Sequence, residues 1–222
     1  MMKTNNAWAR TALEWARIVA GLMVFSLGVH LTIYAHIGLA PWDCLGMGLS
    51  LQTPLNYGQA MTCMALVILA VDLMLGEKIG FGTVIDALLT GNFVQMFNDL
   101  NPFPENQSVG LGVLIMLAGF VLMALGMMIY MRCAQGCGPR DSLLLGLGRR
   151  MKSVPIGAVE ILLWAAVLLL GWALGGSVGI GTLISTLGAG AVMQLVYSVF
   201  RFEPRAIRQR SIPEILRLLK KQ

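Results

Sequence analysis

The chain has 222 residues, of which 57% are hydrophobic and only 12% are charged, and its mean hydropathy is +0.75. Soluble domains carry about 25% charged residues, so this chain lacks the polar side chains that would cover a water-facing globule. The composition excludes a secreted enzyme, a nucleic-acid-binding module and a disulfide scaffold. It predicts an all-α polytopic membrane protein.

Six apolar stretches are long enough to cross the hydrocarbon core, which takes about 20 helical residues. Backbone polar groups inside lipid must be paired within their own segment, so we expect helices. In chain order the predicted spans are Ile18–Ala35, Gly58–Leu75, Ile79–Phe97, Val109–Met131, Pro155–Leu174 and Val178–Phe200. These spans define a cytoplasmic amphipathic amino terminus (1–17), a first three-span repeat (18–100), an outer linker (101–108), a second three-span repeat (109–200) and a basic cytoplasmic tail (201–222).

The distribution of basic residues gives the orientation. All 16 Lys and Arg residues fall in segments that share one side of the membrane when the amino terminus is placed inside. The positive-inside rule therefore predicts that both termini are cytoplasmic. Because the basic residues flank apolar runs, the net charge of +5 indicates topology and no nucleic-acid partner. We expect a multi-pass protein of the bacterial inner (plasma) membrane, with the lipid bilayer as its partner.

The two halves of the chain resemble each other in an ordered series of residues. The matches recur at an offset of 98 early in each half and 99 later. The matched pairs include Gly21 with Gly119, Gly28 with Gly126, Gly38 with Gly136, Pro41 with Pro139, Asp43 with Asp141, Gly58 with Gly157, Gly80 with Gly179, Gly82 with Gly181, Thr83 with Thr182, Gly91 with Gly190 and Gln95 with Gln194. Three spans are an odd number, so the two repeats are expected to be inverted in the membrane, as in many secondary transporters.

Between the first two spans of each repeat lies a shorter apolar segment, Pro41–Leu51 or Pro139–Gly148. Eleven helical residues extend about 16 Å, which is half a bilayer. We therefore expect two short re-entrant or interfacial helices. Proline suits the first helical position, and Asp43 and Asp141 then fall in the first turn, where the helix dipole favours a carboxylate.

Two motifs in each half carry a family resemblance. Gly38-Leu-Ala-Pro-Trp-Asp43 with Gly80-Phe-Gly-Thr83, and Gly136-Cys-Gly-Pro-Arg-Asp141 with Gly179-Ile-Gly-Thr182, resemble the YczE-like family of small bacterial membrane proteins. The resemblance extends from about Arg17 to Phe200. It implies a polytopic plasma-membrane protein, and it implies no catalytic or binding residues.

Eight residues are candidates for binding a substrate or an ion: Asp43, Asp141, Trp42, Arg140, Thr83, Thr182, Asp86 and His30. The two Pro-x-Asp carboxylates have two interpretations, a cation- or proton-coupling group and a capping group at the helix amino end. Arg140 is the counterpart of Trp42, an asymmetry that fits either a binding role or the membrane interface.

The remaining candidates also leave alternatives open. Gly-x-Gly-Thr at the start of two spans suits an anion at a helix amino end or close helix packing by small residues. Asp86 with His30 suits a satisfied interhelical hydrogen bond or a proton relay. Gln95 and Gln194 are expected to join neighbouring helices through polar contacts.

The function that these patterns favour is a small secondary transporter or permease, with a site for a small molecule or ion between the repeats. Few charged residues line any pathway, which favours a neutral or amphipathic solute over a polyanion. Six spans make a thin wall, which favours a homodimer. The alternative is an accessory or regulatory membrane protein that acts through its basic cytoplasmic face. We predict no enzyme activity, no catalytic residues, no metal and no cofactor.

Overall fold

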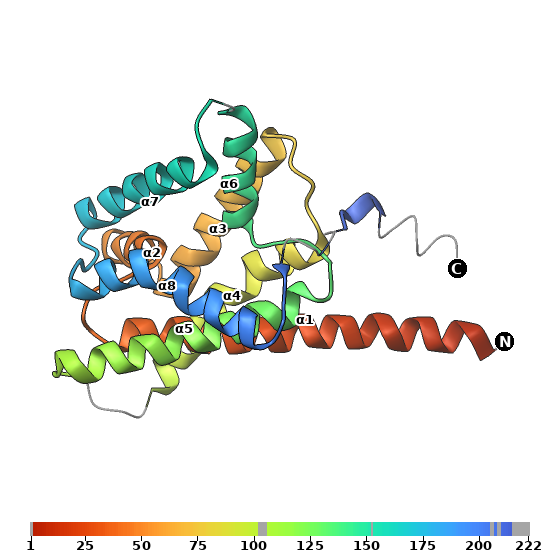
Figure 1. Ribbon diagram of the computed structural model, residues 1–222, viewed down its shortest axis with the longest axis horizontal. Coiled ribbons are helices and arrows are strands. Elements are labelled where there is room, and N and C mark those ends of the chain that lie inside the picture. Colours follow the sequence, from red (N-terminus) through yellow and green to blue (C-terminus); the bar gives the residue numbers. More distant parts are fainter. Residues whose placement is uncertain (1, 102–105, 152, 205–206, 208–209, 215–222) are drawn as a thin grey trace.

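The computed structural model describes residues 2–101, 106–151, 153–204, 207 and 210–214 (Figure 1). In this part of the chain the secondary structure is helical, without strands. The helices are α1 (Met2–Tyr34), α2 (Pro41–Gln52), α3 (Tyr57–Met74), α4 (Phe81–Leu100), α5 (Val109–Met131), α6 (Pro139–Arg150), α7 (Ile156–Ala173) and α8 (Ile180–Val199). The predicted all-α fold is confirmed for the described residues.

Five helices are long and apolar enough to cross a membrane: Ala12–Tyr34 within α1, and α3, α5, α7 and α8. Helix α4 covers the third predicted span, Ile79–Phe97, but is not among them. Its 20 residues include Asp86, Asn92, Gln95, Asn98 and Asp99, which lower its hydropathy. Helix α1 is continuous from Met2, so the predicted amino-terminal segment and the first span form one helix. The two short helices are present, each with 12 residues and a proline in the first turn.

The centre of the fold is the antiparallel pair α1 and α5, which lie side by side (Figure 1). They meet through glycines that the sequence repeat relates. A Cβ built at Gly28 would lie 2.6 Å from the carbonyl oxygen of Gly119, and one built at Gly21 would lie 2.9 Å from that of Gly126. Side chains at these positions would push the helices apart, so the glycines set the close approach of the two halves.

The halves also interlock through their loops. The backbone N–H of Gly181, at the start of α8, donates to the carbonyl of Ile37 at 2.7 Å, and that of Gly82, at the start of α4, donates to Gln135 at 2.7 Å. Each accepting residue precedes a glycine with φ of +113°, Gly38 or Gly136, a backbone conformation that L side chains rarely adopt. In addition, α2 packs on α7 and α6 packs on α3, so each short helix contacts the other half.

The two halves differ in one helix pair. In the first half, α3 packs on α4, and a Cβ at Gly58 would lie 2.7 Å from the carbonyl oxygen of Gly91. In the second half, the counterparts Gly157 and Gly190 have nothing within 4 Å of a built Cβ. Figure 1 shows α7 and α8 diverging from the turn that joins them. The same sequence elements are therefore in contact in one half and apart in the other.

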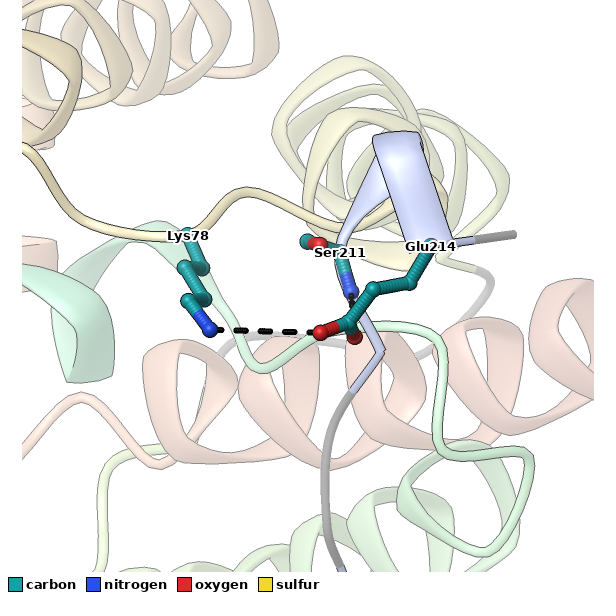
Figure 2. A network of polar contacts seen from close by, with 3 residues as sticks. All are labelled: Lys78, Ser211 and Glu214. Carbon is teal, nitrogen blue, oxygen red and sulfur yellow. Dashed lines mark hydrogen bonds and ion pairs between the residues drawn. The ribbon is translucent and has the colours of Figure 1, made fainter. Parts of the chain in front are cut away.

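The start of the carboxyl-terminal tail contacts two loops. Ile212 donates its backbone N–H to the carbonyl of Ile79 at 2.9 Å, and Arg210 donates to that of Ala134 at 2.9 Å. Figure 2 shows the Glu214 carboxylate between the backbone N–H of Ser211, at 3.2 Å, and Lys78 Nζ, at 3.9 Å. A carboxylate that accepts the backbone N–H three residues earlier forms half of a capping box. The rest of the predicted basic tail, 215–222, lies outside the described residues.

Candidate functional site

A cavity of about 340 Å³ lies where the two halves meet, and every one of the eight helices contributes to its wall. The two short helices bring their amino-terminal turns to it, from Ala40 to Asp43 and from Gly138 to Asp141. Aromatic and apolar side chains from α1, α5, α7 and α8 form most of the remaining surface. The cavity thus lies between the two halves, where the sequence predicts a site.

The two Pro-x-Asp carboxylates both line this cavity, but their surroundings differ. Asp43 is 4% exposed and accepts a hydrogen bond from the Tyr57 hydroxyl at 3.1 Å. Burial raises the pKa of Asp43, while the charge of Arg140 and the Tyr57 hydrogen bond act in the opposite direction. Asp141 is half-buried and accepts no hydrogen bond from the described residues.

For Asp141, burial and the nearby Asp86 carboxylate raise the pKa to about 6, against the opposing charge of Arg140. Neither Asp43 nor Asp141 accepts a hydrogen bond from a backbone N–H of the described residues, so the structure does not support the capping interpretation. The carboxylates face the cavity instead.

Arg140 and Trp42 occupy matching positions on the two short helices and meet inside the cavity. The Arg140 guanidinium carbon lies 5.2 Å from the centroid of the Trp42 ring, a cation–π distance. Its Nη2 lies 3.8 Å from the Met61 sulfur. Among the described residues Arg140 forms no ion pair with a carboxylate within 4 Å. The two residues that differ between the matching positions, Arg140 and Trp42, are therefore in direct contact across the two halves.

Asp86 lies in the cavity wall on α4, where it accepts a hydrogen bond from the Thr90 hydroxyl one turn later. Its second carboxylate oxygen points toward Gly138 and would lie 2.8 Å from a Cβ built there. The Asp141 Oδ2 and the Tyr130 hydroxyl would lie 3.7 and 3.8 Å from the same point. Oxygens from three helices therefore surround a position that has no side chain.

Asp86 and His30 line different cavities, so the structure does not support the relay alternative. His30 Nδ1 lies 2.6 Å from Asn98 Oδ1, and the histidine lines a separate cavity of about 380 Å³ with Tyr34 and Phe97. Asp86 lines the central cavity. The contact between His30 and Asn98 joins α1 to α4 and agrees with the other interpretation, a satisfied interhelical hydrogen bond.

Thr83 and Thr182 are buried and do not belong to the wall of the central cavity. Their hydroxyl oxygens accept hydrogen bonds from the backbone N–H of Gly80, at 3.4 Å, and Gly179, at 3.1 Å. The glycines of each Gly-x-Gly-Thr motif lie against a loop of the other half. The Gly-x-Gly-Thr motifs thus serve close packing and helix capping, and their amide donors are engaged by protein.

The glutamines repeat the difference between the halves. Gln95 Oε1 accepts the backbone N–H of Gly58 at 3.2 Å and joins α3 to α4, as predicted. Gln194 is exposed and has no such partner among the described residues, so its predicted role as a contact between helices is wrong. The reason is that α7 and α8 have separated. The cavity reaches the surface in the same place, at the exposed residue Gly190.

Sequence reasoning missed Tyr57, whose hydroxyl donates to Asp43, and several residues of the cavity wall, including Tyr130, Gly138 and Trp164. The repeat offers one signal for Gly138, because its counterpart Ala40 also lines the cavity. No local pattern identifies Tyr57, which reaches Asp43 from the start of another helix.

The chain is similar to a protein family and to several bacterial proteins. Residues 12–198 match the model of a family described as a family of unknown function, DUF6198. A Haemophilus influenzae protein named "Uncharacterized protein" is 27% identical over 88% of this chain and 91% of its own length. From Bacillus subtilis, "Uncharacterized membrane protein YczE" is 28% identical over 82% of this chain and 84% of its own, and "Uncharacterized protein YyaS" is 28% identical over 79% and 88%.

No solved structure matches this chain. The family model covers most of the chain, and the matched relatives are covered over nearly their full length. The apolar helices and the named membrane relative agree that this is a membrane protein. The chain belongs to the DUF6198 family, which includes YczE-like membrane proteins.

Proposed function

We propose that this protein is a small secondary transporter, with its substrate site in the central cavity between two inverted three-span repeats. The observation that carries the proposal is the difference between the halves. Repeated elements enclose one cavity, yet α3 and α4 are closed on each other while α7 and α8 are open. Exchange of these two arrangements would expose the cavity alternately on opposite sides, which is how inverted-repeat transporters work.

The grouping of the loops supports the inverted topology. Gln135 Nε2 donates to Glu14 at 2.9 Å, and the loops at Ile79 and Ala134 both bind the tail. These are the segments that the positive-inside rule places in the cytoplasm.

The segments expected outside also meet one another. Leu39 donates its backbone N–H to Ser177 at 3.1 Å, and Asn106 donates to the carbonyl of Ala35 at 2.8 Å. Six crossings, with α4 as the least apolar, bring each of these two groups of loops to one face. The polar residues of α4 fit a span that lines a cavity, where ionisable groups in membrane proteins usually lie.

The proposal is tested by uptake into proteoliposomes, with labelled small cations, neutral solutes and anions under an imposed pH gradient. The informative variant is Gly190→Leu, whose Cβ would have nothing within 4 Å in the described arrangement but whose side chain would block closure of α8 on α7. We expect a folded variant without uptake. Gly110→Leu is the matched control, because Gly110 also has nothing within 4 Å and lies at the start of α5, away from the gap. Full uptake by Gly190→Leu would contradict the proposal.

A second function is favoured by the docking of the tail on the loops of the cytoplasmic face (Figure 2). In an accessory protein that regulates another complex, this face would bind the partner. Deleting residues 203–222 would then abolish the cellular phenotype while the helical bundle still inserts. A transporter would keep its uptake after this deletion.

A further inference from the structure

The charges on the cavity wall are out of balance. Four carboxylates line it, Asp43, Asp86, Asp141 and Glu160, and the positive charge that the described lining residues bring is Arg140. Arg140 stacks on Trp42 and forms no ion pair with any of the four within 4 Å. Carboxylates in an apolar cavity are costly unless a proton or a cation compensates them. The cavity therefore has room and charge for a positive group.

The oxygens around Gly138 mark where that group would sit. Asp86 on α4, Tyr130 on α5 and Asp141 on α6 direct oxygens to within 4 Å of the position that a Gly138 Cβ would occupy. The repeat relates Asp86, Tyr130, Asp141 and Gly138 to Ser185, Thr32, Asp43 and Ala40, all in the same wall. At this counterpart position the fold forms without a second acidic residue and without a glycine, so the fold does not explain the arrangement around Gly138.

The rest of the wall suits an apolar body attached to the charge. Phe25, Trp42, Phe120, Tyr130 and Trp164 face the cavity, and aromatic rings attract cations as well as apolar groups. Within the described residues no cluster of three or more His, Cys, Asp or Glu side chains has the geometry to hold a metal ion. The chemistry of the wall therefore fits an organic cation better than a divalent metal.

We propose that the cavity binds a small organic cation, whose ammonium group lies at Gly138 between Asp86, Asp141 and Tyr130 and whose apolar part contacts the aromatic wall. This inference rests on the proposed transport function and names its substrate class. The carboxylates hold a proton when the cation is absent. Binding then exchanges the two charges, with one cation entering and one proton leaving to solvent, so that the cavity keeps its charge.

The electrostatics agree with such an exchange. The pKa of Asp141 is raised to about 6, where a proton is bound and released near neutral pH. The charged groups that act on this carboxyl are Asp86 on α4, Arg140 on its own helix and Glu160 on α7. Tyr130 on α5 and Tyr197 on α8 are the tyrosines close enough for the charge of Asp141 to act on them. Arg140 favours the ionised form, and the two neighbouring acids favour the protonated one.

The test compares three ligands of similar shape on the full chain in detergent. Benzyltrimethylammonium is a permanent cation, neopentylbenzene replaces its nitrogen by carbon, and benzenesulfonate carries a negative charge. A ligand that binds only the folded state raises the melting temperature with its concentration. We expect stabilisation by the cation alone, with release of protons into weakly buffered solution near pH 6. Equal stabilisation by the neutral ligand, or none by the cation at millimolar concentration, would overturn the inference.

Variants locate the site within the cavity. Asp86→Asn and Asp141→Asn should each weaken cation binding about tenfold or more and reduce the proton release. Gly138→Ala should also weaken binding while keeping every charge, because its methyl group would lie 2.8 Å from Asp86 Oδ2. Asp99→Asn is the matched control, an exposed carboxylate at the far end of α4. Unchanged affinity in the folded Asp86→Asn and Asp141→Asn variants would overturn the assignment.

The two proposals fail in different ways. If the cation binds with these properties but never crosses the membrane of proteoliposomes, the binding site stands and the transport function does not. If a neutral or anionic solute is transported and the cation neither competes nor binds, the transport function stands and the substrate class is wrong.

Discussion

Helices α3 and α4 lie against each other along Gly58 and Gly91, whereas α7 and α8, with glycines at the matching positions 157 and 190, do not touch there. The two pairs have the same lengths, 18 and 20 residues, and similar motifs at their starts. The difference therefore does not follow from the repeated residues. The corresponding helix pairs are thus arranged differently in the two halves, and the proposed function requires that these arrangements exchange.

The largest difference in stability between the two halves is expected when a methyl group is placed at matched glycines. Gly91→Ala should lower the free energy of unfolding by about 1–3 kcal/mol, because its Cβ would lie 2.7 Å from the Gly58 carbonyl oxygen and 2.9 Å from the Met61 Cβ. Gly190→Ala meets nothing within 4 Å and should be neutral, or stabilising by up to about 1 kcal/mol through helix propensity. Thermal unfolding in the same detergent measures both. Equal losses would show that the second pair is closed.

The matched glutamines give a smaller effect of the same kind. Gln95→Ala removes the acceptor of the Gly58 N–H, so it should cost about 0.5–1.5 kcal/mol. Gln194→Ala removes an exposed side chain and should change stability by less than about 0.5 kcal/mol. Melting temperatures of the two variants check the prediction, and a larger loss for Gln194→Ala would contradict the open arrangement.

The two aspartates of the short helices should make the stability of the protein depend on pH. The pKa of Asp141 is raised from 3.8 to about 6, so the folded state holds this proton more tightly than the unfolded chain does. Stability should therefore fall as pH rises from about 4 to about 6. In Asp141→Asn this fall should become shallower, and the fall that remains should include the contribution of Asp43, whose pKa is also raised. Melting curves between pH 4 and 8 test this; an unchanged pH dependence would contradict the buried position of Asp141.

The sequence predicted much of this fold and less of its site. Hydropathy located the helices because a membrane segment must be both apolar and about as long as the bilayer is thick. The repeat predicted which positions correspond, and glycines such as Gly28 and Gly119 then proved to face each other at the centre. The short helices were found from Pro41 and Pro139, whose place at a helix start is a local property.

What failed depends on packing between distant elements. His30 and Asp86 were paired because both are ionisable and lie in spans, yet they face different cavities. Tyr57 and Tyr130 were overlooked because a tyrosine in an apolar helix has no local signature of its partner. The glycines and the glutamine that the repeat shares give no signal for the separation of α7 from α8, because they are the same in both halves. The polar pair Thr62 and Asn92, which joins α3 to α4, has the apolar counterparts Ile161 and Ala191.

The most direct test of an exchange between the halves is a pair of cysteine cross-links in a protein freed of Cys44, Cys63, Cys133 and Cys137. Thr62 and Asn92 join α3 to α4, with Asn92 Nδ2 3.4 Å from Thr62 Oγ1, and their counterparts on α7 and α8 are Ile161 and Ala191. We predict that Thr62→Cys with Asn92→Cys cross-links at rest and stops uptake. Ile161→Cys with Ala191→Cys should cross-link during turnover. If the second pair never cross-links and the first leaves uptake intact, the two halves do not exchange arrangements.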